Sequence, residues 1–333
     1  MALARSHPKG SPIDVARVGI VRKWWIRTIQ SLGNLHRRML AALFAALGPV
    51  LAYRITGWGA SFIYFLLEPL RTRSEAQCRI ALRDRVDTKE VPRIARQSFI
   101  NRARNITDLM LASHLLRPET CQRYGGQIAE PFRTELLNDQ ARRQPTILLT
   151  AYYGSFDLLP IFLGHNGIRA TVVYLPHSNQ GYDEYRRRIR GQSGSQLVAV
   201  QQAAVRLAQV LNAGGTVALI ADHHLEDRGI ETEFLGLKTK ASRSVGLLAW
   251  RYGANVVVAA IRRIGDTFRF EVVVEEVLYY KDVAKEPDPV KFITARYMRA
   301  LERLILADPA QYLWAYARWG DEHARRVTAK EIS

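Results

Sequence analysis

The sequence is poor in cysteine and in acidic residues. Its 333 residues include two cysteines, Cys78 and Cys121, which belong to no Cys-x-x-Cys or Cys/His spacing. The sequence therefore predicts neither a disulfide framework nor a zinc site. Asp and Glu number 31 against 48 Lys and Arg, which leaves a net charge of +17. That charge favours an anionic partner, a class that includes nucleic acid, acidic proteins and anionic membrane surfaces.

Several signature motifs are also missing. There is no GxSxG, P-loop, GxGxxG or HExxH pattern, so a hydrolase elbow, a nucleotide fold and a zincin site lack their usual marks. No nucleic-acid-binding module is recognisable, and the basic residues are spread through helical stretches rather than placed between stacking aromatics. We therefore expect no nucleic-acid partner.

No apolar run reaches the roughly 20 residues that a membrane-spanning helix needs. Residues 39–53 carry no charge, and a second apolar run covers 60–67; the first 38 residues hold eight basic side chains and one acidic one. Cations beside an apolar face are typical of interfacial helices. We expect residues 1–70 to form a membrane-associating segment, helical from about residue 15 and broken at Gly48-Pro49. A buried hairpin behind a disordered basic tail is the alternative.

The remaining sequence divides into two parts. Residues 71–144 have apolar side chains at helical spacing and predict a helical lead-in packed on the core. Residues 145–325 alternate short apolar runs with helical stretches, which predicts an α/β fold with a mixed, mostly parallel sheet flanked by helices. The expected strands are 145–153, 169–175, 195–200, 215–224, 254–263 and 268–277.

The end of this core is expected to differ from its beginning. The last two strands are joined by Ile264-Gly265-Asp266 and predict a hairpin at one edge of the sheet. A helix over about 289–307 and another possible strand at 311–321 follow. Ligands of such sheets bind beyond the carboxyl ends of strands, which nominates the turns at 153–157, 176–190 and 222–227.

The first of these turns carries a resemblance to a known family. Residues 152–158, Tyr-Tyr-Gly-Ser-Phe-Asp-Leu, resemble the His-Phe-Gly-Asn-Trp-Glu-Leu of lipid A late acyltransferases, members of the lysophospholipid acyltransferase superfamily. In that family the acid orients the His, which deprotonates the acceptor hydroxyl. Gly154 matches, Asp157 takes the acid position, and Tyr152 replaces the His. A phenol with a pKa of about 10 is a poor base at neutral pH.

Later blocks extend the resemblance over about residues 145–320. They include Arg190 before Gly191, an Asp-His strand end followed by Phe-Leu-Gly, and Gln-Tyr-Leu-Trp with Tyr316 in place of a second family His. The resemblance implies catalytic roles for Asp157 and Tyr152, and phosphate binding by two arginines. The substrate-binding residues that it implies are Gly154, Arg190, Asp222, Gly236, Ser242 and Arg318.

Three features keep more than one interpretation. His223 could supply in space the imidazole that Tyr152 lacks, or hold its turn by a structural hydrogen bond. The cluster 222–227 is rich in metal-capable groups, but neighbours on a strand point to opposite faces, so we expect no metal site. Arg186, Arg187 and Arg188 leave open which arginine matches the family's Arg, and the alternative is that they form a solvated helix face.

The resemblance implies transfer of a fatty acyl group to a hydroxyl of a membrane lipid or glycolipid. The donor would be acyl carrier protein or acyl-CoA, acting as co-substrate with no further cofactor. The expected partners are membrane lipid and acyl carrier protein, and the expected location is the cytoplasmic face of the inner membrane. The alternative is a non-catalytic member of the same fold that binds lipid or acts as a scaffold.

Overall fold

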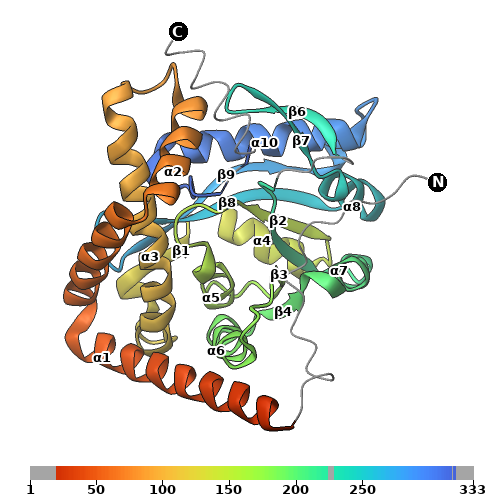
Figure 1. Cartoon of the computed structure of the whole chain (residues 1–333). Helices are drawn as coiled ribbons and strands as arrows, with labels where there is room; N and C mark the ends of the chain where they lie inside the picture. Colours follow the sequence, from red (N-terminus) through yellow and green to blue (C-terminus); the bar gives the residue numbers. More distant parts are fainter. Residues whose placement is uncertain (1–19, 224–228, 317, 320–333) are drawn as a thin grey trace.

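A seven-stranded sheet forms the centre of the computed structural model, which describes residues 20–223, 229–316 and 318–319 (Figure 1). The strand order is β1-β9-β8-β2-β5-β3-β4, and every neighbouring pair is parallel except β8 and β9. The strands are β1 (Gly125–Ile128), β2 (Thr146–Thr150), β3 (Ala170–Tyr174), β4 (Gln196–Ala199), β5 (Thr216–Ile220), β8 (Asn255–Arg263) and β9 (Phe270–Leu278). The predicted fold class and all six predicted strands are confirmed.

Helices cover both faces of the sheet. Because successive side chains of a strand point to opposite faces, Ile147 and Leu149 of β2 enter one apolar cluster and Leu148 enters the other. The first cluster also holds side chains of α2 (Glu68–Leu82), α7 (Ala203–Asn212), α8 (Ser244–Tyr252) and α10 (Pro289–Ala307). The second holds side chains of α1 (Ile20–Leu66), α4 (Phe132–Ala141), α5 (Leu159–His165) and α6 (Gln180–Arg190). Helix α3 (Val91–Leu115) contributes to both clusters.

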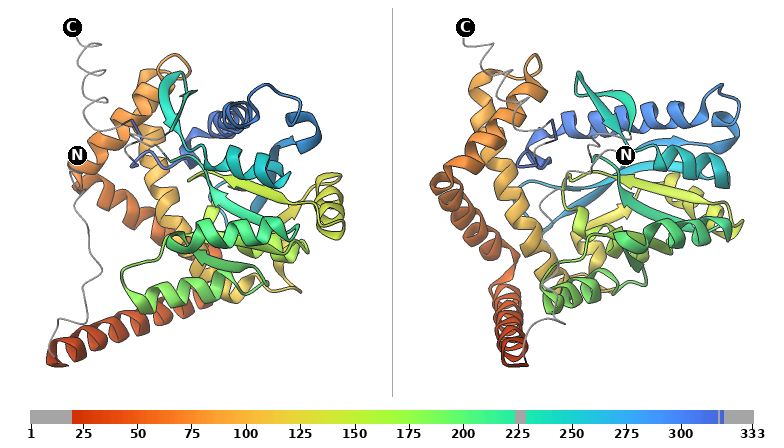
Figure 2. Two further views of the ribbon diagram at one scale, coloured as in Figure 1. Left: turned by 90° about the vertical axis from the view of Figure 1, so that its right-hand side faces the viewer. Right: turned by 45° about the vertical axis from the view of Figure 1, so that its right-hand side comes forward.

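Helix α1 is bent, as the sequence predicted. Gly48 has non-helical angles of φ 77° and ψ 163° immediately before Pro49, and proline in a helix interior removes a hydrogen bond and clashes with the preceding turn. Figure 2 shows the two arms of α1 running along the outside of the molecule in different directions. The break therefore divides the apolar segment instead of leaving one straight rod.

One side of α1 is buried and the other is apolar and exposed. Ala52 and Tyr53 are almost completely buried, while Trp58, Phe62 and Phe65 are each at least 67% exposed. The exposed apolar face also includes Met39, Leu43, Val50, Leu51, Ile55, Ile63 and Leu66. By length and composition alone, one described helix could cross a membrane, Met39–Leu66, with a mean hydropathy of 1.6.

Three sequence expectations about the sheet and its surroundings were wrong or incomplete. The β8–β9 hairpin is not at the edge, because the short strand β1, which was not predicted, pairs with β9. A second hairpin, β6 (Ile230–Phe234) and β7 (Leu237–Ala241), was also missed. The possible strand at 311–321 forms only one bridge, between Tyr312 and Tyr153, within its described residues.

Candidate active site

The turn after β2 runs close to the neighbouring strand β8. Gly154 has φ +56°, and a Cβ at this position would lie 2.0 Å from the carbonyl oxygen of Ile261, so the turn requires glycine. The amide of Ser155 donates to the same carbonyl oxygen at 2.8 Å, and the Asn105 side chain donates to the carbonyl oxygen of Gly154 at 2.9 Å. Gly154 thus fixes the path of the turn that carries Asp157.

A buried polar network secures this turn to α3 and β8. The Ser155 hydroxyl donates to the Asp108 carboxylate at 2.7 Å and accepts from the guanidinium of Arg263 at 2.8 Å. Asp108 and Arg263 also form a direct ion pair, and Tyr53 of α1 donates to Asp108. The candidate membrane helix and the turn after β2 therefore share one set of buried hydrogen bonds.

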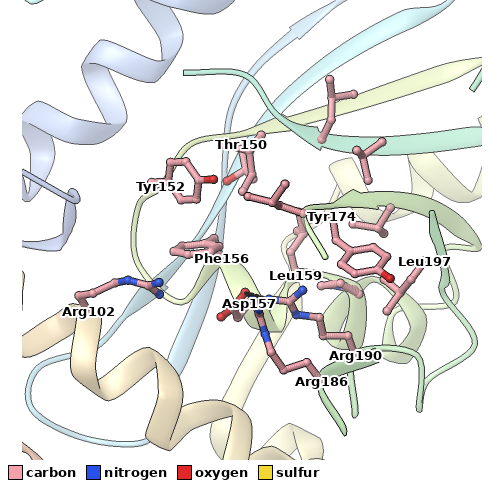
Figure 3. Close-up of a pocket in the computed structure, with 16 residues that line it drawn as sticks. Arg102, Thr150, Tyr152, Phe156, Asp157, Leu159, Tyr174, Arg186, Arg190 and Leu197 are labelled. Atoms are coloured by element: carbon pink, nitrogen blue, oxygen red, sulfur yellow. Dashed lines mark hydrogen bonds and ion pairs between the residues drawn. The ribbon is translucent and has the colours of Figure 1, made fainter. Parts of the chain in front are cut away.

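A cavity of about 170 Å³ lies beyond the carboxyl ends of β2, β3 and β5. Figure 3 shows that charged side chains gather on one side of it, where Asp157 lies among arginines from two helices. The rest of the lining is largely apolar and includes Leu159, Leu197 and Leu219. A cavity with one charged and one apolar wall suits an amphiphilic ligand with a polar head and a hydrocarbon chain.

Asp157 is held by arginines and not by a histidine. Its carboxylate forms a hydrogen-bonded ion pair with Arg190, and Arg186 lies 3.7 Å away. Burial alone raises the pKa of the Asp157 carboxyl, but the positive charges of Arg190, Arg186 and Arg102 outweigh burial and hold that pKa below its usual value. Asp157 is therefore a permanently charged anchor of the arginine side chains at neutral pH.

Tyr152 lies in an aromatic group at the border of the cavity. Its ring centroid is 5.1 Å from that of Phe156, 5.3 Å from that of His223 and 6.1 Å from that of Tyr316. Burial, followed by the nearby Asp222 charge and Tyr316, raises the pKa of the Tyr152 phenol. This shift moves Tyr152 further from the protonation state that a general base needs.

His223 lies beside Tyr152, the residue that replaces the motif His, and is outside the set of residues that line the cavity. It follows β5, which pairs with β2 in register from Thr146–Thr216 to Thr150–Ile220. The half-buried ring of His223 contacts Tyr152 and lies 6.2 Å from the ring of Tyr316. Both tyrosines that replace family histidines therefore flank this one histidine.

Asp222 is completely buried beside the same turn. Its Oδ2 accepts a hydrogen bond from the Tyr152 amide at 3.3 Å, while its Oδ1 has no hydrogen-bond partner among the described residues. Asp222 thus contacts the backbone of the site and lies outside the set of side chains that line the cavity.

Five of the six predicted substrate-binding residues do not line this cavity: Gly154 and Asp222 lie in the turns beside it, and the other three lie elsewhere. Gly236 forms the β6–β7 turn with φ +77°. Ser242 accepts from the Ser244 amide at 3.2 Å at the start of α8. The Arg318 guanidinium is fully buried and lies 4.1 Å from the ring centroid of Phe234. The sequence grouped these three residues with Arg190. The structure places them outside the cavity, beside the apolar cluster that α8 and α10 share with the β6–β7 hairpin.

Two cavity residues were missed by sequence reasoning. Arg186 was assigned to a solvated helix face, yet it pairs with Asp157, whereas its neighbours Arg187 and Arg188 are exposed. Arg186 and Arg190 are four residues apart and so share one face of α6, a spacing that could have identified the pair. Arg102 comes from α3, and no local pattern links that helix to the strand ends.

Within the described ranges, no group of three or more His, Cys, Asp or Glu side chains could hold a metal ion. His224, Glu226 and Asp227 of the candidate metal cluster lie outside the described residues.

A sequence comparison identifies the family of the chain. Residues 39–320 match the family described as bacterial lipid A biosynthesis acyltransferase. No curated protein matches the chain. The matched range includes the exposed apolar arm of α1, the whole sheet and every residue of the cavity. The chain therefore belongs to the bacterial lipid A biosynthesis acyltransferase family.

Proposed function

We propose that the protein transfers a fatty acyl group from an acyl carrier protein or coenzyme A thioester to a hydroxyl of a lipid A-like glycolipid. The observation that carries this proposal is the cavity that Asp157 and its arginines line together with Leu159, Leu197 and Leu219. The apolar wall suits the acyl chain, and the charged wall suits the polar parts of both substrates.

The exposed apolar face of α1 supports a location at the membrane surface. Its outward-facing aromatic residues, Trp58, Phe62 and Phe65, are side chains that settle at the boundary of headgroups and hydrocarbon. The opposite side of the helix is packed on the protein, so this arm suits a position lying along one leaflet. We place the protein at the cytoplasmic face of the inner membrane, because both acyl donors are cytoplasmic and the net charge of +17 favours the anionic lipids of that leaflet.

His223 is the side chain that we assign as general base. Its imidazole accepts the proton of the acceptor hydroxyl, the oxygen attacks the thioester carbonyl carbon, and an ester bond forms as the C–S bond breaks. The thiolate leaving group then takes the proton from the imidazolium. Asp157 positions Arg190 and Arg186 in this proposal, in place of orienting the base.

The raised pKa of Tyr152 favours a second candidate function. A protein that lost the motif imidazole but kept the cavity would bind an acylated lipid without turnover. Such a protein would serve as a lipid-binding or scaffolding member of the family.

Transfer of radiolabelled acyl chains from both donors into extracted membrane lipids separates the two candidates. We expect a labelled lipid with the unaltered protein and a loss of about 10²–10⁴-fold with His223→Ala, the range for removing a general base. His114→Ala, which alters an exposed histidine of α3, is the matched control, and Asp157→Ala tests the arginine anchor. Full activity of His223→Ala would exclude the assigned base, and no product from any form, with lipid binding intact, would favour the second candidate.

A further inference from the structure

The charged wall of the cavity has more positive than negative groups. Arg102 from α3 and Arg186 and Arg190 from α6 line it together with one carboxylate, Asp157. Their formal charges leave an excess of two positive charges in one partly buried space. Like charges in such a space repel one another more strongly than they would in water, so the wall favours an anionic ligand.

The three arginines differ in how much of their hydrogen-bonding capacity is used. Arg190 is paired directly with Asp157, and its side chain is 7% exposed. Arg186 lies 3.7 Å from the same carboxylate, which is beyond the range of a normal hydrogen bond. Arg102 has no hydrogen-bond or ion-pair partner among the described residues; its guanidinium lies 5.8 Å from the centroid of the Phe156 ring.

The two arginines with unused donors approach the cavity from different sides. Figure 3 shows the guanidinium of Arg102 directed from α3 toward Phe156 and Asp157, and that of Arg186 reaching Asp157 from the other side. Both charges act on the Asp157 carboxyl and help to lower its pKa. An anion bound beside Asp157 would lie in the field of both guanidinium groups.

A phosphoryl group fits this arrangement better than a carboxylate does. A phosphomonoester carries up to two negative charges, which would balance the excess of two, and a phosphodiester carries one; in both, the oxygens match the planar donors of more than one guanidinium. A carboxylate has one charge on two oxygens and so matches fewer of these donors.

We infer that Arg102 and Arg186 form a phosphoryl-binding subsite on the charged wall, held in position by the Asp157–Arg190 pair. The inference rests on the proposed function in one respect, because it takes the phosphoryl group to be part of a substrate. That group has two possible sources, the phosphopantetheine arm of the donor or a phosphate on the acceptor glycolipid. Asp157 and Arg190 are positioning residues in this subsite.

Binding of inorganic phosphate to the full chain tests the subsite without any turnover. We expect ³¹P line broadening with the unaltered protein, and at least five-fold weaker binding in Arg102→Gln and in Arg186→Gln. Arg96→Gln on α3 and Arg188→Gln on α6 remove exposed charges from the same helices and should change binding less than two-fold. Equal losses in all four variants, or no binding by the unaltered protein, would overturn the inference.

Substrate analogues identify the source of the phosphoryl group. If the acceptor supplies it, Arg102→Gln raises KM for the glycolipid, and a dephosphorylated glycolipid removes the difference between variant and parent. If the donor supplies it, acyl-pantetheine lacking the phosphate removes that difference instead. An Arg102→Gln defect that persists with both truncated substrates would contradict the subsite. Phosphate binding that depends on Arg102, without acyl transfer, would refute the proposed function and leave the subsite standing.

Discussion

Two buried aspartate–arginine pairs involve the turn after β2, and their surroundings differ. In the first, Asp108 and Arg263 are each at most 2% exposed. Arg263 also donates to Tyr53 at 3.2 Å, to Asn101 at 3.1 Å and to Asn105 at 2.6 Å. This pair is balanced in charge, and its donors have partners within the protein.

The second pair, Asp157 and Arg190, is neither balanced nor closed. Two further arginines face the same carboxylate, and Nε of Arg190 lacks a hydrogen-bond partner among the described residues. The first pair joins α1, α3 and β8 and so is a structural joint, whereas the second faces a cavity. Burial of an ion pair alone therefore does not indicate a functional site, whereas unbalanced charge beside a cavity indicates a ligand-binding site.

The largest expected effect is on stability at the closed pair. Arg263→Met leaves Asp108 buried without its cation, and we expect a loss of about 3–5 kcal/mol in the free energy of unfolding. Combining it with Asp108→Asn removes both charges and should recover part of that loss. Denaturant unfolding of the single and double variants measures both values. If Arg263→Met were as stable as the parent, the structural role of the Asp108–Arg263 pair would be refuted.

At the open pair we expect a large effect on rate and a smaller one on stability. Asp157→Asn releases Arg190 and Arg186 from their positions, and misplacement of positioning groups costs about 10²-fold in rate. The free energy of unfolding should fall by about 1.5–3 kcal/mol, the contribution of a hydrogen bond to a charged group. Acyl-transfer kinetics and denaturant unfolding on one preparation test this, and a stability loss equal to that of Arg263→Met would remove the distinction between the pairs.

A smaller effect is expected at Tyr152. Because the pKa of its phenol is raised by burial and by Asp222, Tyr152→Phe should change kcat by no more than a factor of about three, far less than the loss of a general base. The rate of the parent should also level off well below pH 10. A rate that still climbs above about pH 10 and loses that climb in Tyr152→Phe would identify the phenol as the base.

The smallest expected effect is the acid dependence of the open pair. The pKa of Asp157 is lowered in the folded protein, since the three arginines outweigh burial. Its stabilising contribution is therefore fully present above the unfolded value of about 3.9 and is lost as the pH falls through the folded value. The difference in the free energy of unfolding between the parent and Asp157→Asn should be constant from about pH 5 to pH 7. In stronger acid this difference should become smaller. A difference that narrows already near neutral pH would contradict the arginine anchor.

Apolar periodicity was sufficient to predict most of the fold. The buried strands have runs such as 146–150 and 255–261, and the bend of α1 follows from Gly48-Pro49. Strand β1 was missed because Gly125-Gly126 has no side chains to give a pattern, and its pairing with β9 depends on tertiary contact. The β6–β7 hairpin was missed although charged residues alternate along both strands, a pattern that is typical of half-buried strands.

The order of the strands in the sequence was sufficient to predict part of the candidate site. Tyr152, Asp157 and His223 follow strands whose carboxyl ends meet at one edge of the sheet, and sequence order reveals such ends. Arg102 was beyond prediction, because its position depends on how α3 packs across the sheet. The position of Arg318 beside Phe234 likewise depends on tertiary packing.

The closed joint between α1 and the sheet has a consequence for how far a lipid must move. Because Tyr53 of α1 donates to Asp108, which accepts from Ser155, the exposed face of α1 and the turn beside the cavity belong to one hydrogen-bonded unit. On the proposed bilayer, each methylene raised out of hydrocarbon and exposed to water would cost about 0.8 kcal/mol. A substrate chain would therefore leave the proposed bilayer only as far as the apolar lining of the cavity covers it.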